Sequence, residues 1–309
     1  MSQWTVADDD VGQRIDVWLA RRAALSRKDV KRAMDQGSVR VNGKRVAIAK
    51  WELVRGDRVQ LVKVAPTERG RERIANYRRI NVLFEDRDLI AVEKPAGITV
   101  VPVEGTSEAT MVDQVRAYLR RKHPESRGTF VRALHRLDRD TSGIVLMAKS
   151  RLGERATALF KRHAIRREYL AIVHGALEEE DGTIDLPLTK GEFGHGRKVV
   201  PAVGKLKKIG KHAVTHFHVE ERYRDATLLK VRVETGRTHQ IRVHLASLGH
   251  PILGDRRYGP LTDPVPVGRQ ALHAALLGLH HPVTGEKMEL KLPPPTDFAA
   301  LIDVLRTRA

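Results

Sequence analysis

The sequence feature that most limits how this chain can fold is the stretch VRALHRLDRDTSGIVLMAKS, residues 131–150. It ends in a continuous apolar run from Ile144 to Ala148, which is typical of a strand buried on both faces. Polar side chains dominate residues 135–142 just before this run, and they are poor material for a core. We therefore expect a functional site where the strand begins.

The rest of the chain predicts an α+β fold with a mixed, largely antiparallel central sheet and flanking helices. Its strand candidates are separated by hairpins and by only occasional helices. One helix is expected after the capping box of Thr110 and Asp113, and another over residues 151–162. Further strands are expected at residues 81–84, 89–92, 170–173, 182–186, 215–220, 227–233 and 288–292.

A basic segment interrupts this pattern. Residues 189–212 are rich in glycine, lysine and histidine and show little hydrophobic period. We expect a long, mobile, basic loop there, which bears on the choice of partner rather than on chemistry.

Charge and cysteine content narrow the function classes. The net charge is +18, which points to a polyanionic partner and to nucleic acid first. The chain has no cysteine, so disulfides and cysteine-ligated zinc or iron–sulfur sites are excluded. The early acidic residues do not resemble a secretory signal, and no apolar run approaches the roughly 20 residues that cross a membrane. We expect a cytoplasmic protein without membrane contact.

Residues 1–64 predict a small module of their own. Ile15, Trp18 and Leu19 have helical spacing, and a second helix is expected from Ser26, ending before Gly37. The Asn42-Gly43 pair then predicts a tight hairpin. Residues 65–79 hold five arginines with a proline and a glycine, and we expect a flexible basic linker there.

The pieces RIDVWLA, SRKDVKRAM and GSVRVNGKRV resemble, in order and spacing, the alpha-L RNA-binding module first named from a small-subunit ribosomal protein. That resemblance implies that the basic surface of the second helix contacts RNA phosphates. The expected contacts are Arg27, Lys28, Lys31 and Arg32, whereas the alternative is a solvated helix face.

Spacing alone leaves several chemistries open at the first polar cluster. Asp138 and Asp140 are two residues apart and could be the carboxylate pair of a glycosidase-like hydrolase. An aspartate flanked by arginines also suits a nucleophile, because guanidinium groups keep the carboxylate ionised. A structural arginine–aspartate pair accounts for the same residues without catalysis. The sequence contains neither a serine nucleophile elbow nor a phosphate-binding glycine loop.

A second polar cluster, ETGRTHQIRVH, occupies residues 234–244. His239 and His244 could be metal ligands, but a spacing of five residues suits one helix face poorly. No nearby carboxylate completes a zinc set. Surface or structural histidines are the favoured interpretation, and we expect no metal site.

Taken together, the motifs resemble the RluA class of RNA pseudouridine synthases. The resemblance covers about residues 80–295, implies the pseudouridine synthase fold, and suggests a catalytic domain over residues 80–309. The motifs that carry it, in chain order, are EKPAGITVVP at 93–102, HRLDRDTSG at 135–143, REYLAIVHG at 167–175, ETGRTHQIRVHLASLGHPILGD at 234–255 and ALHAALLGLHHP at 271–282.

The resemblance also implies a role for each matching residue. Asp138 would be the catalytic aspartate, which attacks the target uridine or removes a proton to detach its base. Arg242 would pair with Asp138 and hold it ionised. Tyr169 would stack on the flipped base, and Arg136 would fill the space that the nucleotide leaves.

Among substrates, the resemblance favours uridines of large-subunit ribosomal RNA, with transfer RNA as the alternative. A non-catalytic RNA-binding factor for ribosome assembly is a further alternative from another class. The isomerisation implies no cofactor and no obligate protein partner, and we expect a monomer.

Overall fold

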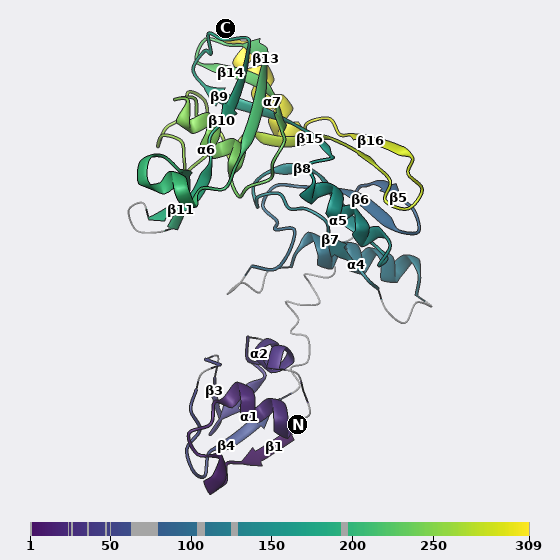
Figure 1. The fold of residues 1–309 in the computed structure, drawn as a ribbon, viewed down its shortest axis with the longest axis vertical. Helices are drawn as coiled ribbons and strands as arrows, with labels where there is room; N and C mark the ends of the chain where they lie inside the picture. Colours follow the sequence, from purple (N-terminus) through teal and green to yellow (C-terminus); the bar gives the residue numbers. More distant parts are fainter. Residues whose placement is uncertain are drawn as a thin grey trace. The chain divides into compact units, whose positions relative to one another are not determined.

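In a computed structural model of the chain, the described residues form two compact units (Figure 1). The first is built from residues up to Val62, and the second largely from residues 80–308. The expected linker at residues 65–79 and the expected helix start at Ser26 lie outside the described residues. The structure describes residues 2–23, 25, 27–35, 37–46, 48–49, 51–62, 80–103, 109–124, 129–192 and 197–308.

The first unit packs two helices against a small antiparallel sheet, as the sequence predicts. Its core contains Trp18, Leu19, Val30 and Met34, all almost fully buried. In the hairpin, Asn42 and Gly43 both have positive φ (51° and 80°), which this tight turn requires. The elements are β1 (Ser2–Thr5), η1 (Asp8–Asp10), α1 (Ile15–Arg22), α2 (Arg27–Asp35), β2 (Val39–Val41), β3 (Lys44–Arg45) and β4 (Arg58–Leu61), with strand order β1-β4-β2-β3.

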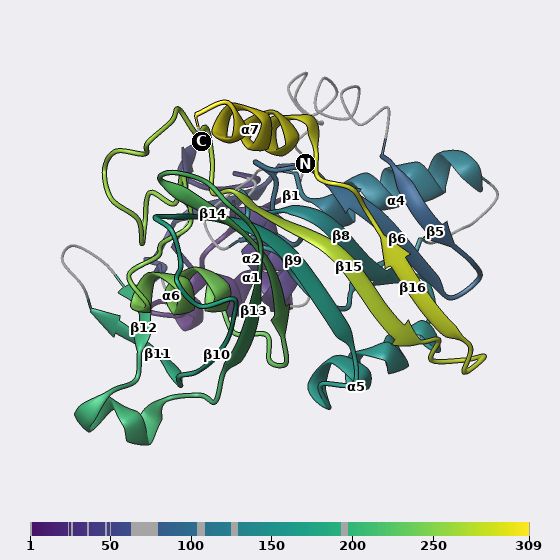
Figure 2. The same cartoon turned by 90° about the horizontal axis from the view of Figure 1, so that it is seen from above.

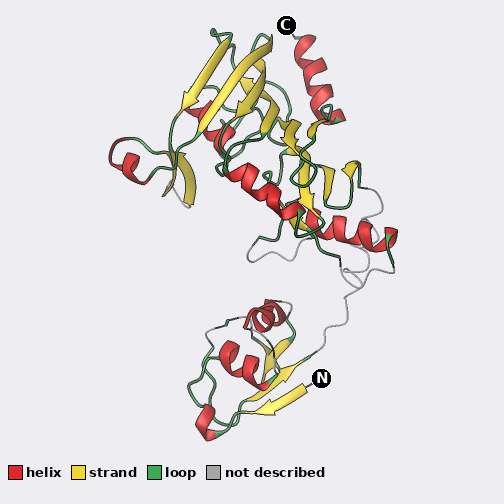
Figure 3. Cartoon of the chain, turned by 45° about the vertical axis from the view of Figure 1, so that its right-hand side comes forward, coloured by secondary structure: helices red, strands yellow, loops and turns green. Residues whose placement is uncertain are grey.

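The second unit is built on one mixed, ten-stranded sheet with flanking helices, which confirms the predicted fold class (Figures 2 and 3). The main strand order is β10-β13-β14-β9-β15-β8-β6-β5, with β16 added to β15 and β7 added to β8. These strands are β5 (Val82–Glu85), β6 (Leu89–Lys94), β7 (Arg132–Ala133), β8 (Ser142–Ala148), β9 (Arg166–His174), β10 (Asp181–Asp185), β13 (Val214–Arg222), β14 (Ala226–Val233), β15 (Leu272–His280) and β16 (Lys287–Lys291).

The sheet consists of two antiparallel halves that meet at one parallel contact, between β8 and β15. Only two residue pairs form this contact, Ser142 with His273 and Gly143 with Ala274, and we call them the seam. At the seam Gly143 has φ +128°, and a Cβ atom there would lie 2.4 Å from the carbonyl oxygen of Ala274. Glycine is therefore required for the two strands to approach.

Strand β8 is buried on both faces, as its apolar run predicts. On one face Ile144 and Leu146 share a core with α5 (Ala156–Lys161), which follows the short turn η2 (Gly153–Arg155). On the other face Val145 and Met147 pack with α4 (Met111–Lys122). The predicted capping box of α4 is confirmed, with Thr110 as N-cap and Asp113 as its partner.

In the other half of the sheet, two helices close the core around β9 and β14. Ile241 and Leu245 come from α6 (Gln240–Ser247). Phe298 and Leu301 come from α7 (Thr296–Arg306). Neither helix, nor strand β15, was expected from the sequence.

The prediction of a long loop over residues 189–212 is wrong. The segment instead forms a two-stranded hairpin of β11 (Leu188–Glu192) and β12 (Arg197–Pro201), followed by the 3-10 helix η3 (Gly204–Ile209). Five backbone-paired positions define the hairpin, whose tip at residues 193–196 lies outside the described residues. Its alternation was hidden because glycine and charged residues stand on both faces.

Within the described ranges, no helix combines the length and the apolar character needed to cross a membrane.

Candidate active site

The turn that leads into β8 is held by bonds to its backbone and side chains. The amide of Thr141 donates to the carbonyl of Asp138 at 3.2 Å. From the segment before β15, Gln270 Nε2 donates to Thr141 Oγ1 at 2.7 Å. Arg269 Nη1 donates to the carbonyl of Asp140 at 3.2 Å. These bonds fix the backbone that follows Asp138, so its carboxylate projects from a rigid support.

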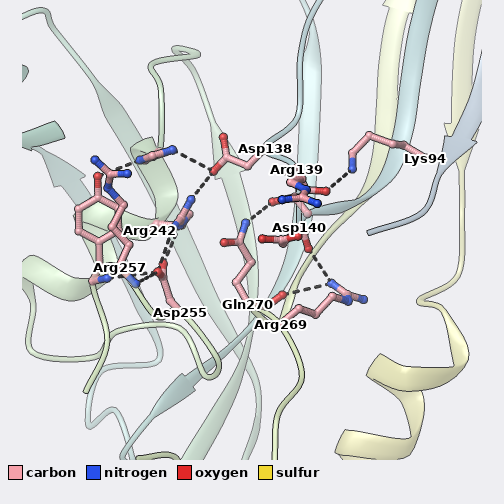
Figure 4. Close-up of polar contacts among 12 residues, drawn as sticks. Lys94, Asp138, Arg139, Asp140, Arg242, Asp255, Arg257, Arg269 and Gln270 are labelled. Carbon is pink, nitrogen blue, oxygen red and sulfur yellow. Dashed lines mark hydrogen bonds and ion pairs between the residues drawn. The ribbon is translucent and has the colours of Figure 1, made fainter. Parts of the chain in front are cut away.

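Lys94, at the end of β6, supports the same turn from the other side. Its side chain is fully buried, and Nζ donates to the carbonyls of Pro95 and Ile98 at 2.8 Å each. A third bond, to the carbonyl of Arg139 at 2.7 Å, reaches the turn (Figure 4). Burial lowers the pKa of Lys94 to about 7, and the negative charge of Asp140 opposes that shift.

Arg242 joins Asp138 to a second, fully buried carboxylate (Figure 4). Its Nη1 donates to Asp138 Oδ2 at 2.8 Å, while Nε and Nη2 bind the two oxygens of Asp255 at 2.6 and 2.8 Å. The side chains of Asp138, Arg242 and Asp255 are 25%, 9% and 0% exposed. Burial opposes the charge on Arg242, but the two carboxylates raise its pKa above the ordinary value. The guanidinium is therefore permanently charged and binds the carboxylate of Asp138 through a charge-assisted hydrogen bond.

The start of α6 is fixed by one amide side chain, which places Arg242. Gln240 Oε1 accepts from Thr235 Oγ1 at 2.7 Å and from the amide of Arg237 at 3.0 Å. Its Nε2 donates to the carbonyl of Val214 at 2.9 Å. These bonds tie the start of the helix, and with it the backbone of Arg242, to β13.

Tyr169 lies next to the seam, on β9. It pairs with Ala274 of β15, the residue that also contacts Gly143. Burial raises the pKa of the Tyr169 phenol, and the charge of Asp138 raises it further. The hydroxyl is therefore protonated at neutral pH, and Tyr169 lies near enough to Asp138 for the charge of that carboxylate to affect it.

His239 and Tyr258 complete the surroundings of Asp138. His239 Nε2 lies 3.9 Å from Asp138 Oδ2, and its Nδ1 is 2.8 Å from the hydroxyl of Tyr258. The guanidinium of Arg242 lies over the Tyr258 ring, 5.1 Å from its centroid.

The histidines of the second cluster have partners that are not metals. His244 bridges Thr215 Oγ1 and the carbonyl of Leu186, both at 2.9 Å. Together with the contacts of His239, this favours roles other than metal binding for both rings. Over the described ranges, no group of three or more histidine or acidic side chains is arranged to hold a metal.

The remaining predicted residues of the site are exposed. Arg136 is exposed just before the turn. Asp140 is also exposed, and Arg242 binds the carboxylate of Asp138 rather than that of Asp140. The two aspartates therefore have different environments, and of these two carboxylates Arg242 binds only that of Asp138.

The first unit presents arginines that are held by buried carboxylates. Arg27 binds Asp16 at 2.9 Å, and Arg14 binds the same carboxylate at 3.0 Å. Lys31 is exposed on α2; Lys28 and Arg32 lie on the same helix, but their side chains are outside the described set. A second pair of this kind joins Asp10 to Arg21 and Arg22. We call Arg14, Arg21, Arg22 and Arg27 the arginine cluster.

Sequence reasoning missed Asp255, Lys94 and Tyr258 as parts of the site. Asp255 ends the motif GHPILGD and Lys94 precedes Pro95 in EKPAG, so each stands at a motif boundary. For Asp255 and Lys94, the signal in the sequence was a charged residue next to a turn-forming Gly or Pro. The burial of these two residues could not be predicted, because it depends on segments far away in sequence.

Comparisons with known proteins find similar families and a similar fold. A family model described as RNA pseudouridylate synthase matches residues 88–247, and a model of the S4 domain matches residues 13–59. Among solved structures, human RNA pseudouridylate synthase domain containing 4 is similar, with a TM-score of 0.62 and 22% identity. The similarity covers 76% of this chain and 97% of that one, and it shows the fold.

Curated relatives match over nearly the full length. An uncharacterized RNA pseudouridine synthase of Bacillus subtilis is 36% identical over 98% of this chain and 97% of its own. The ribosomal large subunit pseudouridine synthase D of Vibrio parahaemolyticus is 35% identical, with 98% and 94% covered. The ribosomal large subunit pseudouridine synthase C of Salmonella typhi is also 35% identical, with 98% and 96% covered.

Proposed function

Because the chain belongs to the RNA pseudouridine synthase family, we propose that it isomerises specific uridines of large-subunit ribosomal RNA, with Asp138 as the catalytic residue. The observation that carries the catalytic assignment is the Asp138–Arg242–Asp255 arrangement, in which one charged guanidinium binds the partly exposed carboxylate of Asp138 and the buried carboxylate of Asp255. The choice of substrate is supported by the full-length similarity to ribosomal large subunit pseudouridine synthases.

The reaction breaks the bond between N1 of the uracil and C1′ of the ribose, turns the base, and joins C5 to C1′. C5 loses a proton and N1 gains one, so no electrons are transferred to an acceptor. The carboxylate of Asp138 acts as nucleophile or as base in the cleavage step. No redox cofactor is required by this balance, and we propose that none is used.

Two further residues are proposed to hold the extruded nucleotide. Tyr169 stacks on the uracil, since an aromatic ring beside the carboxylate is accessible to a flipped base. Arg136, exposed just before the catalytic turn, stacks in the RNA where the base has left.

The first unit is proposed to bind RNA phosphates through α2 and the arginine cluster. The candidate contacts on α2 are Arg27, Lys28, Lys31 and Arg32, and the net charge of +18 supports binding of this kind. We further propose a monomer that works in the cytoplasm, where ribosomal RNA is modified in bacteria.

The proposal is tested in a strain that lacks this protein, complemented with wild type or with Asp138→Asn. Ribosomal and transfer RNA are mapped by carbodiimide modification and primer extension. Stops in large-subunit RNA are expected with wild type and not with Asp138→Asn. Stops only in transfer RNA would overturn the substrate, and stops that do not depend on Asp138 would overturn the catalytic assignment.

Two controls make the result specific to chemistry. Purified Asp138→Asn is expected to keep the wild-type Tm and RNA affinity, because the side chain is partly exposed and Asn is isosteric. Asp140→Asn is expected to retain the stops, whereas a hydrolase with two essential carboxylates would lose activity in both variants.

A further inference from the structure

His239 has a backbone conformation that L-residues rarely adopt. It precedes α6 as the N-cap residue with φ 56° and ψ 19°, in the left-handed region. Its side chain makes no capping bond to the helix, although capping is the usual reason for a polar residue at this position. Because no capping bond compensates for this backbone strain, we expect the side chain of His239 to have a role in contacts outside the helix.

The imidazole ring is held in place by Tyr258. Nδ1 of His239 and the hydroxyl of Tyr258 are 2.8 Å apart, and the two rings meet edge to face with centroids 5.6 Å apart. Tyr258 is itself fixed, because Arg242 lies over its ring and its amide donates to Asp255 Oδ1 at 3.2 Å. The orientation of His239 is thus set by the same residues that set Arg242.

The side chains of Arg242 and His239 both lie close to the same oxygen of the Asp138 carboxylate, Oδ2. Arg242 Nη1 lies 2.8 Å from Oδ2, and His239 Nε2 lies 3.9 Å from the same atom. The two oxygens are therefore distinct before any substrate binds.

We propose that His239 is a positioning residue which, together with Arg242, holds Oδ2 of Asp138, so that Oδ1 is the oxygen that meets the uridine. The hydroxyl of Tyr258 donates to Nδ1, which places the ring proton on Nε2, facing the carboxylate. The distance of 3.9 Å shortens to a hydrogen bond when the substrate closes the site, as catalytic contacts commonly do. This role rests on the proposed function of Asp138.

The state of the ring agrees with this assignment. Burial lowers the pKa of His239, while the charge of Asp138 opposes the shift, so the ring is neutral at neutral pH. A neutral ring carries one N–H, and the tautomer decides which partner receives it. The opposite tautomer would set a lone pair against the carboxylate, which is repulsive.

The first test is the tautomer, measured by nitrogen-15 NMR on the histidine-labelled full-length protein, with His239→Gly used to assign the signal. We expect Nε2 to be protonated and Nδ1 to be an acceptor in wild type. In Tyr258→Phe, Nδ1 has lost its donor and its shift should change. A proton on Nδ1 in wild type would overturn the proposal, whether or not an RNA substrate has been found.

The second test uses the backbone strain to separate a positioning role from a structural one. His239→Gly removes the ring but relieves the left-handed strain, because glycine adopts positive φ readily. We expect a Tm at or above wild type, an unchanged RNA Kd, and a single-turnover rate lowered about 10- to 100-fold. A Tm that falls along with the rate, or a rate equal to wild type, would each contradict the inference.

Companion variants sharpen this result. His239→Gln keeps an N–H donor near the position of Nε2 and should recover part of the rate. Tyr258→Phe should lower the rate less than His239→Gly, and the double variant should be no slower than His239→Gly alone, because Tyr258 acts through His239. His218→Gln, at an exposed histidine that binds Asp181, is the matched control and should keep the wild-type rate. If wild type itself makes no pseudouridine, the proposed function fails while the tautomer measurement still decides the role of His239.

Discussion

Both units of this chain pair arginines with aspartates, but they expose opposite members of the pair. In the second unit Arg242 and Asp255 are buried, and Asp138 is the accessible member. In the first unit Asp10 and Asp16 are buried, whereas the arginine cluster is 39–63% exposed. The same ion pair thus presents a carboxylate at the proposed catalytic site and guanidinium groups on the surface that is proposed to bind RNA phosphates. In each unit the buried partner orients the exposed one.

The largest effect is expected from Arg242→Ala, which removes the buried cation of the second unit. Asp255 is left buried and unpaired, which should cost about 3–5 kcal/mol in the free energy of unfolding. The rate should fall about 10²- to 10³-fold, because Asp138 loses its orienting donor. Urea unfolding and single-turnover assays measure the two effects.

A paired variant separates the two effects of that change. Arg242→Met combined with Asp255→Leu removes both buried charges, so most of the stability should return while the rate stays low. Recovery of the rate in this variant would show that Arg242 matters only for stability, and the contrast between the two units would be lost.

The next prediction tests whether the second unit contacts RNA through Tyr169 as well as through the carboxylate of Asp138. Tyr169→Ala should weaken RNA binding by about 1–3 kcal/mol, the range for loss of base–aromatic stacking. Tyr169→Phe keeps the ring and should bind RNA as wild type does. Equal affinities of the two variants in filter binding would remove Tyr169 from the substrate contacts.

Lys94 is a buried charge that bonds to carbonyl groups instead of a carboxylate, and it should make activity depend on pH. Its pKa of about 7 is set by burial and by Arg269, against Asp140 and Asp138. Above that pH the amine has two N–H donors for three carbonyls, and one lost bond costs about 0.5–1.5 kcal/mol. The rate should therefore fall a few-fold as pH rises.

The stability of the protein should respond to the same titration with the opposite sign. Between pH about 7 and 10.5 the unfolded chain still binds the proton that folded Lys94 has lost. The contribution of Lys94 to the free energy of unfolding therefore rises with pH across this window. Urea unfolding of wild type and of Lys94→Met at several pH values measures it; equal slopes would contradict the assignment.

The smallest effect is expected in the first unit. Arg27→Ala should reduce the slope of log Kd against log salt by about one and leave the Tm unchanged. Asp16→Asn should instead lower the Tm slightly and keep the salt slope, since the arginines stay charged. If both variants changed the slope equally, the division between orienting and exposed partners would not hold in this unit.

Local signals in the sequence predicted the elements that local physics determines. The capping box at Thr110, the Asn42-Gly43 turn and the doubly buried strand β8 each depend on a few neighbouring residues. Helix α6 was missed because all residues from Gln240 to Leu245 are buried, polar and apolar alike, so no amphipathic period exists. Helix α7 did carry such a period, at Phe298, Leu301, Ile302 and Leu305, and it was overlooked.

The residues of the site can also be divided into those that the sequence indicated and those that only the structure revealed. The resemblance named Asp138, Arg242 and Tyr169, and the structure brings Asp138 and Arg242 into contact across 104 residues of sequence. The burial of Asp255 and Lys94 depends on contacts across the sheet, which no local pattern reports. The strain at His239 was likewise not predicted from the sequence, because most histidines have negative φ even though the residue type is enriched at positive φ.

The seam also determines the order in which a newly synthesised chain becomes able to bind RNA and to modify it. Asp138 precedes β8 in one half of the sheet, whereas Arg242 and Tyr169 belong to the other, so neither half contains a site by itself. Contacts between residues so far apart in sequence form late, whereas the first unit needs only its own residues. We expect each nascent molecule to be able to hold RNA before it can change a base. Recognition would then precede chemistry in the lifetime of every copy.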